Sequence, residues 1–458
     1  DDAFFNWQRP GAAQFRHPHA FLGLMCNILH DHYAELVEAF YGAGARAVTF
    51  QQMLPPDLKD KYAYEAGDER LWLLTCRRAT MEAVLRRYVE TRTDVSVINP
   101  CTVTGIISEK ANDNIVVRGV TFEFKGESRQ RLADVVVDAS GRTSRFPKWL
   151  GQSGGDVVEE KHDAKITYYT RHYRLKPGAT EPPRGNRSGA GDLGYLRFGV
   201  FPGDNGHFAI IICLPFEEKA LRTAVRDGNK FDRICRSIPA LQSWLDDERS
   251  EATTEPFGIG DIVSVWRDFV RDGRPVAHNF YAVGDSAVRT NPLYGRGCST
   301  GMLHARLLVQ ILDTIDDPKR RALALHEQTR AKLRPIFDLS VREDMGGIKR
   351  AEAIRQGKAL HEPDSMRERL RLAFRDALGA ASRENLHVAR GAMRSFNLLE
   401  KPGEFLNDWS VRWTVLRYML RGRTTNARRR MQPGPDRDEM HRLLETGPLD
   451  REARAPVS

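Results

Sequence analysis

The sequence predicts a mixed α/β protein in which two parts of one α/β sheet flank an antiparallel sheet along the chain, with a helical region at the end. Two short apolar runs without alternation, residues 132–137 and 279–283, are typical of strands buried on both faces. Longer β-rich runs between residues 166 and 214 predict a separate antiparallel sheet. Beyond Asp316 the apolar spacing is mostly helical.

Apolar spacing also predicts the individual elements. Residues 21–41 and 77–90 have the i, i+3/i+4 pattern of amphipathic helices. Polar breaks at 112–114 and 125–127 predict hairpin turns. The predicted strands are 95–98, 103–107, 115–117, 120–124, 132–137, 166–175, 195–200, 207–214 and 279–283. The later predicted helices are short ones within 217–245, one from about Ser299 through Ile311, and 320–340, 366–378 and 409–420.

Composition excludes several classes of protein. Of the 458 residues, 41% are hydrophobic and 29% are charged, which is the balance of a globular chain of two or three domains. No apolar run approaches the roughly 18 residues of a membrane-spanning helix. The six cysteines form no CxxC pair and no Cys/His cluster at zinc spacing, so we expect no metal site and a reducing, cytoplasmic location.

The net charge of +9 is concentrated near the end of the chain. Residues 331–458 contain 26 Lys and Arg against 18 Asp and Glu. A basic region of this kind favours either an acidic partner, such as an anionic membrane surface, or a solvated Arg-rich helical surface. No nucleic-acid-binding motif accompanies it, so we expect no nucleic-acid partner.

The strongest functional signal follows the second buried strand. Residues 284–301 read GDSAVRTNPLYGRGCSTG, which places Asp285 at the carboxyl end of a strand and opens a helix after a Gly-rich turn. Asp285 can accept hydrogen bonds from sugar-like hydroxyls. The free N–H groups and the positive dipole end at the helix start can stabilise an anion. The pattern therefore favours a ligand with a polyol part and an anionic part.

This order of GD, NP and GxG resembles the third FAD motif of the aromatic hydroxylase (p-hydroxybenzoate hydroxylase-like) superfamily of flavin monooxygenases. The resemblance implies that Asp285 holds the ribityl chain of FAD and that the helix start faces the pyrimidine edge of the flavin. It implies cofactor contacts for Gly284, Asp285, Pro292, Gly295, Gly297 and Cys298. The alternative is a plain strand–turn–helix whose glycines serve only tight turns.

Residues 138–145, DASGRTSR, end the first buried strand and resemble the second motif of the same family, which lies near the FAD pyrophosphate and the nicotinamide donor. The resemblance implies that Asp138 and Gly141 contact FAD. Here Ala-Ser stands between the Asp and the Gly, whereas the family has Asp-Gly directly, and this departure weakens the nicotinamide role. The alternative is a surface turn with solvated Arg142 and Arg145.

Five residues at three places in the sequence have two interpretations each. Arg77 and Arg78 resemble the family's Arg that reaches the FAD phosphates or ribose; we assign Arg78, and the pair leaves the register open. His17 and His19 either contact substrate or relay protons near the flavin, or are plain loop residues. Cys298 either has a lowered thiol pKa at the helix start or packs beside the flavin. No catalytic residue is assigned.

A GxGxxG pattern at residues 189–194 is not a dinucleotide fingerprint. It lies in a Pro/Gly-rich stretch, 177–194, and neither follows a strand nor opens a helix, so we interpret it as a loop. In the family the fingerprint precedes the segment that resembles residues 7–23, and the sequence given starts without it. We therefore expect weak or absent FAD retention by the chain as given.

The resemblance covers roughly residues 7–315 and implies a Rossmann-like FAD-binding domain (1–160 and 257–315) interleaved with a β-sheet substrate domain (161–256). A helical basic region (316–458) follows. The implied function is an FAD-dependent monooxygenase that uses NAD(P)H and O2 to hydroxylate or epoxidise an apolar or aromatic small molecule. The sheet aromatics expected to roof its pocket are Tyr168, Tyr169, Tyr173, Tyr195, Phe198, Phe201 and Phe208.

Three alternatives remain. A polyprenyl reductase-like enzyme shares the fold, and so does a halogenase-like enzyme, although the sequence contains no WxWxIP motif. From a different class, the chain could be a noncatalytic flavoprotein remnant that binds partners or membranes through its basic region.

Overall fold

The computed structural model describes residues 2–9, 12, 14–111, 114–183, 189–358, 365–430 and 433–445. Parts of three predictions lie outside the described residues: the turn at 112–113, the loop at 184–188, and the ends of the domain ranges. The domain boundaries at 160, 256 and 315 stay predictions. Among the described residues, no helix combines the length and the hydropathy that crossing a bilayer requires.

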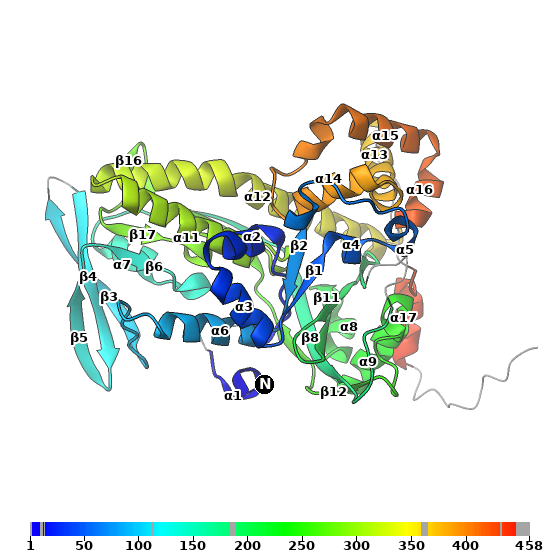
Figure 1. Ribbon diagram of the computed structural model, residues 1–458, viewed down its shortest axis with the longest axis horizontal. Helices are drawn as coiled ribbons and strands as arrows, with labels where there is room; N and C mark the ends of the chain where they lie inside the picture. The colour runs from blue at the N-terminus through cyan, green and yellow to red at the C-terminus, as the bar shows by residue number, and fades with distance from the viewer. Residues whose placement is uncertain are drawn as a thin grey trace, which may run out of the picture.

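A parallel pair of strands lies between the β3–β5 end of the molecule (residues 102–132) and α11 (Gly297–Thr314) (Figure 1). β6 (Val136–Asp138) pairs with β17 (Phe280–Ala282), in the register Val136↔Phe280 and Asp138↔Ala282. The prediction of a buried strand is confirmed for β17, which is buried throughout. For 132–137 it is wrong: Leu132 belongs to another strand and is 71% exposed, and Val137 is 43% exposed because only one face of β6 is covered by described residues.

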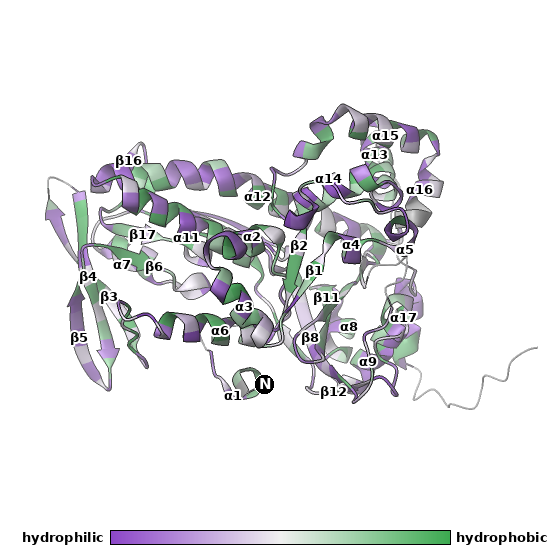
Figure 2. Ribbon diagram, in the orientation of Figure 1, coloured by the Kyte–Doolittle hydropathy of each residue, from purple (hydrophilic) through white to green (hydrophobic). Residues whose placement is uncertain are grey.

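A three-stranded antiparallel sheet lies at one end of the molecule (Figure 1), in the order β3 (Thr102–Ala111), β4 (Asn114–Phe124) and β5 (Glu127–Leu132). Lys125 and Gly126 make the turn between β4 and β5 with positive φ. β5 is exposed along its whole length and is mostly hydrophilic in Figure 2. The strand predicted at 95–98 does not form; its valines and isoleucine stay exposed because no described strand pairs with them.

The antiparallel sheet at the other end has the order β12-β8-β11-β10-β9, with β13 also pairing with β8. Its strands are β8 (Ile166–Leu175), β9 (Ala190–Asp192), β10 (Arg197–Pro202), β11 (His207–Pro215), β12 (Ser250–Ala252) and β13 (Phe257–Ile259). One face packs under the helices α8 (Lys219–Ala224), α9 (Gly228–Arg236), α10 (Pro239–Gln242) and α17 (Arg437–Glu445). The other face, with Tyr168, Ile211 and Cys213, packs toward Leu293 in the predicted cofactor motif.

The first part of the chain forms helices around a two-stranded sheet, β1 (Arg46–Thr49) with β2 (Trp72–Thr75). The helices are α1 (Asp2–Asn6), α2 (Gly23–His32), α3 (Ala34–Gly42), α4 (Phe50–Met53), α5 (Pro56–Lys59) and α6 (Arg78–Glu90). α6 confirms the helix expected at 77–90. The single helix expected at 21–41 is interrupted at Tyr33, whose φ of −144° and ψ of 50° are not helical. The apolar spacing continues through the break, so it does not reveal the interruption.

The remaining small elements connect these layers. They are α7 (Phe146–Gln152), β7 (Val158–Asp163), β14 (Val263–Asp268), β15 (Val270–Arg271), β16 (Arg274–Pro275) and β18 (Val288–Arg289). The 3₁₀ turns are η1 (Asp68–Arg70), η2 (Gly141–Thr143), η3 (Gly284–Ser286), η4 (Pro292–Tyr294) and η5 (Glu404–Asn407).

Two long helices follow β18 and η4. α11 (Gly297–Thr314) confirms the helix expected from about Ser299, and α12 (Pro318–Arg355) is longer than the predicted 320–340. In Figure 1, α12 runs from the β3–β5 end toward the sheet that contains β8 and β11. α13 (Met366–Glu384), α14 (Leu386–Phe396), α15 (Trp409–Leu420) and α16 (Arg423–Arg430) form a helical layer with its own small core.

Candidate functional site

Asp285 lies in η3, three positions after the end of β17, and its carboxylate makes no hydrogen bond with any described residue. Burial raises the pKa of this carboxyl, and the positive charges of Arg289, Arg78 and Arg142 oppose that rise. Three guanidinium groups therefore lie near a carboxylate that has no direct partner. A ligand with hydroxyls and phosphates can supply hydrogen-bond donors to the carboxylate and acceptors to the guanidinium groups.

The start of α11 forms the wall next to Asp285. A Cβ built on Gly297 would lie 3.9 Å from Asp285 Oδ1, and one built on Gly284 would lie 3.8 Å from the Cα of Gly301. The backbones of η3 and α11 therefore run close together. Among the residues that the structure describes, no side chain caps α11, so the N–H groups of its first turn remain available to a ligand beside the carboxylate.

The structure separates the roles of Arg77 and Arg78. Arg77 is buried and forms an ion pair with Asp204, at 2.7 Å between Nη2 and Oδ2. Arg78 instead points to the site, where its Nη1 lies 3.3 Å from Cys298 Sγ and its charge acts on Asp285. Of the two, Arg78 is the one placed for ligand contact. Burial raises the thiol pKa of Cys298, so the alternative of a lowered pKa is wrong: desolvation outweighs the nearby Arg78.

Asp138 has its carboxylate fully occupied inside the protein. It accepts hydrogen bonds from the Ser140 N–H (2.9 Å), the Ser144 hydroxyl (2.6 Å) and the Ser286 hydroxyl (3.1 Å), and also from the Ser140 hydroxyl. Gly141, at a φ of +76°, donates its N–H to Ser286 Oγ. The extra Ala-Ser in this motif therefore supplies a partner for Asp138.

The loop with Pro292 and Gly295 is held by Asn291 of the NP element, by Tyr168 of the expected aromatic set, and by Asp344, which the sequence did not single out. Asn291 is fully buried; its side-chain oxygen contacts the Tyr168 hydroxyl, and its Nδ2 donates to Asp344 Oδ1 at 2.6 Å. Asn291 stands inside the recognised motif, so its position was available as a signal. Asp344 lies in the long helical pattern of α12, about fifty residues later, and nothing in that pattern distinguishes it.

His17 is buried and His19 is half-buried, and both are uncharged near neutral pH. His17 Nδ1 lies 2.8 Å from Thr170 Oγ1 on β8, and His19 Nδ1 lies 2.8 Å from the His17 carbonyl oxygen. Burial lowers the pKa of each imidazole to about 3. A charged histidine at these positions is therefore excluded near neutral pH, whereas a neutral hydrogen-bonding role remains open.

Only some of the aromatic residues expected to line the pocket lie on the face of the sheet that packs toward residues 284–301. Tyr168 and Phe201 lie on the face of the sheet that packs toward Leu293. The other expected aromatics pack on the opposite face, in the core beneath the helices; they are Tyr169, Tyr173, Tyr195, Phe198 and Phe208. The alternation of side chains along a strand explains the division, because neighbouring tyrosines such as 168 and 169 must point to opposite faces.

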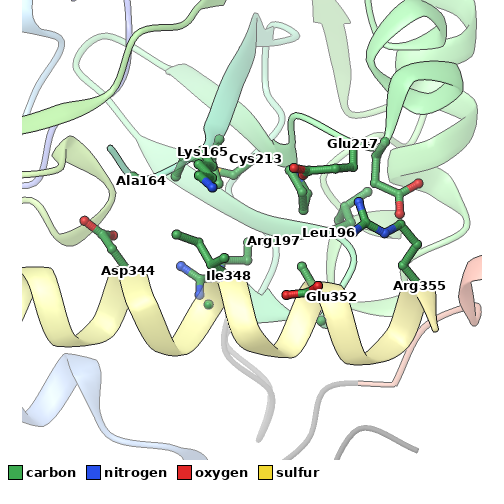
Figure 3. A pocket seen from close by; sticks show the side chains of 16 residues that line it. Ala164, Lys165, Leu196, Arg197, Cys213, Glu217, Asp344, Ile348, Glu352 and Arg355 are labelled. Atoms are coloured by element: carbon green, nitrogen blue, oxygen red, sulfur yellow. The ribbon is translucent and has the colours of Figure 1, made fainter. Parts of the chain in front are cut away.

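A cavity of about 190 Å³ lies on the Tyr168 face of the sheet, between β10, β11 and α12 (Figure 3). Its inner wall includes Cys213 and Arg197 from the sheet, with Asp344 and Ile348 from α12. Asp344 also accepts a hydrogen bond from Asn291, so this side chain connects the cavity to the loop that contains Pro292 and Gly295.

Comparison with known proteins identifies the fold. No family model matches the chain. Protein Rv3254 of Mycobacterium tuberculosis (strain ATCC 25618 / H37Rv) is 24% identical over 282 residues, which are 59% of this chain; the match spans just over half, 56%, of that relative. The flavin-dependent brominase Bmp2 superposes with a TM-score of 0.53 at 15% identity, covering 86% of this chain and 88% of that one. PqsL of Pseudomonas aeruginosa, described as a probable FAD-dependent monooxygenase, gives 0.51 at 16% identity, over 74% and 86%.

The chain has the fold of FAD-dependent monooxygenases and halogenases. The fold expected from the sequence is thereby confirmed.

Proposed function

We propose that the chain is an FAD-dependent oxidoreductase, and that its reaction is NAD(P)H- and O2-dependent hydroxylation or epoxidation of an apolar or aromatic small molecule. The observation that carries the proposal is the Asp285 carboxylate, which has no hydrogen-bond partner among the described residues and faces a helix start. The monooxygenase and halogenase fold supports the same cofactor.

The residues around Asp285 fit FAD. Asp285 would accept hydrogen bonds from the ribityl hydroxyls, and the N–H groups at the start of α11 would face the electron-rich edge of the ring system. Arg78 would contact the phosphate end, since a guanidinium donates to phosphate in a forked geometry. When bound, FAD would take reducing equivalents from the nicotinamide and deliver them to O2.

The chain's own residues would orient the reactants and exclude water. Asn291 and Tyr168 fix the loop that contains Pro292, and the apolar residues Ile211 and Phe201 cover it from the sheet. His17 would act as a neutral hydrogen-bonding group, because its pKa lies far below neutrality. No general base is assigned. A cytoplasmic location is part of the proposal, and the six free cysteines support it.

A pair of flavin analogues tests the proposal without turnover. Riboflavin contains the ribityl hydroxyls, whereas lumiflavin has the same ring system without them. We expect Asp285→Asn to weaken riboflavin binding about tenfold and to leave lumiflavin binding nearly unchanged, because only the hydroxyls need the carboxylate. Fluorescence titration measures both. Equal effects on the two analogues, or no saturable riboflavin binding by the unaltered chain, would contradict the proposal.

Product analysis distinguishes the enzyme classes that share the fold. Substrate-dependent NAD(P)H consumption in the presence of FAD and O2 separates an enzyme from a noncatalytic remnant. An inserted oxygen, a reduced double bond or a carbon–halogen bond in the product then identifies a monooxygenase, a reductase or a halogenase.

For the basic C-terminal region, we propose peripheral contact with an anionic membrane surface through α15. Its outer face carries an apolar stripe at helical spacing, namely Trp409, Trp413, Leu416 and Leu420, which are 66, 47, 45 and 83% exposed. The opposite face of α15 is buried against α13. Residues 409–430 contain seven Arg and no Asp or Glu. Exposed tryptophans flanked by arginines are the composition of helices that lie in a membrane interface.

Vesicle sedimentation tests this contact. We expect binding to vesicles that contain phosphatidylglycerol and not to pure phosphatidylcholine vesicles, with a loss of about tenfold in the double variant Trp409→Ser/Trp413→Ser. Leu132→Ser is the matched control, since Leu132 is 71% exposed on β5 at the distant end of the molecule (Figure 1). Equal losses of vesicle binding in the double variant and the control, or tighter binding to an acidic protein than to the vesicles, would overturn the proposed membrane contact.

A further inference from the structure

The imidazole of His19 has one nitrogen bound inside the protein and one without a partner among the described residues. Nδ1 lies 2.8 Å from the carbonyl oxygen of His17. Because a carbonyl oxygen only accepts hydrogen bonds, Nδ1 carries a proton. Burial, together with the charge of Arg78, lowers the pKa of the ring to about 3, so the ring holds only that one proton near neutral pH. Nε2 therefore has a lone pair and can only accept a hydrogen bond.

Nε2 of His19 is accessible to a ligand. It has no hydrogen-bond partner among the described residues, yet it is not one of the buried polar atoms that lack a partner. The residue as a whole is half-buried, and it lines a small cavity together with Arg78 and Cys76. His172 lines the same cavity and provides a contrast: its Nε2 donates to the Arg16 carbonyl oxygen, but its Nδ1 is fully enclosed. Of these two ring nitrogens, only Nε2 of His19 can meet a ligand.

His19 lies beside the loop that contains Gly295 and close to the start of α11. A Cβ built on Gly295 would lie 2.9 Å from the Cβ of Ala20, the residue that follows His19. Arg78 supplies the second link, because its charge acts on the His19 ring and its Nη1 lies 3.3 Å from the Sγ of Cys298, in the first turn of α11. The accessible imidazole nitrogen therefore belongs to the same site as the first-turn N–H groups of α11.

The donors and the acceptor at this end of the site match one chemical group. The N–H groups at the start of α11 and the guanidinium of Arg78 are donors, whereas His19 Nε2 is a neutral acceptor. An imide has an N–H between two carbonyl groups, so it offers one donor flanked by two acceptors. The pyrimidine part of a flavin ring contains such an imide. The Asp285 carboxylate is already assigned to the ribityl hydroxyls of the same cofactor.

We infer that Nε2 of His19 accepts the imide N–H of the flavin ring, and that the start of α11 donates to the carbonyl group beside it. This role of His19 rests on the proposed function and adds a side chain that recognises the ring itself, whereas Asp285 and Arg78 recognise the ribityl chain and the phosphates. His19 is assigned to binding and not to proton transfer, because a group with a pKa of about 3 takes up almost no proton near neutral pH.

Lumiflavin and 3-methyllumiflavin provide a matched pair of probes, since a methyl group replaces the imide hydrogen in the second and the two compounds are otherwise identical. Neither has a ribityl chain or a phosphate, so neither depends on contacts with those groups. We expect the unaltered protein to bind lumiflavin about tenfold more tightly, because the methyl group removes the donor and meets the imidazole. Fluorescence titration without nicotinamide measures both affinities.

Two substitutions at position 19 separate hydrogen bonding from shape. His19→Ala removes the acceptor and makes room for the methyl group, so the two analogues should bind within about threefold of each other. His19→Gln can place its amide oxygen where Nε2 was, and it should keep a preference of about fivefold for lumiflavin. Arg16→Ala is the control from the same loop. The Arg16 side chain is exposed and donates to the Phe5 carbonyl oxygen, so this variant should keep the preference of the unaltered protein.

The outcomes distinguish this role of His19 from the proposed function. Equal affinities of the unaltered protein for the two analogues would overturn the role of His19, and this measurement needs no variant to fold. An undiminished preference for lumiflavin in His19→Ala would also overturn it, because the imide N–H would then meet another group. The comparison of riboflavin with lumiflavin in Asp285→Asn depends on the ribityl hydroxyls and not on the imide. A failure of the proposed function is therefore recognised separately.

Discussion

The carboxylate of Asp138 and the hydroxyl of Ser286 are joined by a buried hydrogen bond of 3.1 Å, although 148 residues separate them in the chain. The same hydroxyl accepts the N–H of Gly141 at 2.8 Å. Asp138 ends β6, and Ser286 lies just after β17, in η3. These two bonds therefore hold together the turns that follow the two parallel strands, and with them the two regions that resemble cofactor motifs.

Ser286→Ala should destabilise the protein by about 1–3 kcal/mol, because it leaves the Gly141 N–H without its partner and removes one donor from a buried carboxylate. Urea unfolding measures the change. Ser128→Ala is the control, since Ser128 is exposed on β5, and it should change stability by less than about 0.5 kcal/mol. A loss no larger than that of the control would show that the Ser286 hydroxyl does not hold the two turns.

The order and type of the main elements could be predicted from the sequence. β17, α6 and the strands around Tyr168 have strong local patterns, so β pairing and helix formation there follow from apolar spacing. The break at Tyr33 and the exposed Val137 could not be predicted in the same way. Both depend on which neighbouring elements cover a side chain, and periodicity carries no information about that.

The candidate site likewise contains residues that the sequence could locate and residues that only the fold brings together. Asp285 and the glycines after it stand in a contiguous motif, so the sequence was sufficient to locate them. Asp344 comes from a distant helix, and only the fold brings it to Asn291. The assignment of Arg78 over Arg77 also needed the structure, because the two adjacent side chains differ only in what the fold places beside them.

Arg77 and Arg78 should therefore respond differently to truncation. Arg77→Ala leaves the buried carboxylate of Asp204 without its ion-pair partner and should cost about 3–5 kcal/mol of stability. Arg78→Ala should cost about 1 kcal/mol or less, because that side chain is 24% exposed and its pairing with Glu82 is local. Arg78→Ala should nevertheless weaken FMN binding about tenfold and spare riboflavin, which has no phosphate. Unfolding and fluorescence titrations measure these effects, and equal stability losses would contradict the assignment.

Acid should destabilise the protein through His17. Its folded pKa is about 3, lowered from 6.5 chiefly by burial, so between these values the unfolded state binds more protons than the folded state. The stability is full above pH 6.5 and falls as pH decreases, by up to about 1.4 kcal/mol per pH unit. His17→Gln should make the decline between about pH 7 and about pH 5 shallower in urea unfolding. His30→Gln, at an exposed position, should leave the slope unchanged; if both variants behave alike, His17 is not the responsible group.

Alanine substitutions at Gly295, which follows η4, and at Gly273, between β15 and β16, distinguish the cost of backbone strain from the cost of steric contact. Both have a left-handed backbone, with φ of +67° and +71°, so alanine at either position should cost about 1–2 kcal/mol from strain. Only at Gly295 does a new Cβ meet a neighbour, the Cβ of Ala20 at 2.9 Å, whereas nothing lies within 4 Å at Gly273. We therefore expect Gly295→Ala to be the more destabilising variant in thermal unfolding.

The second substitution Ala20→Gly removes the atom that a Cβ at position 295 would meet. In the Gly295→Ala background it should restore stability to the level of Gly273→Ala, since only the backbone strain then remains. The same double variant should recover any riboflavin affinity that Gly295→Ala loses, because the loop with Pro292 can return to its place. If Ala20→Gly restores neither stability nor riboflavin binding, the close approach of these two segments does not determine the loop's position.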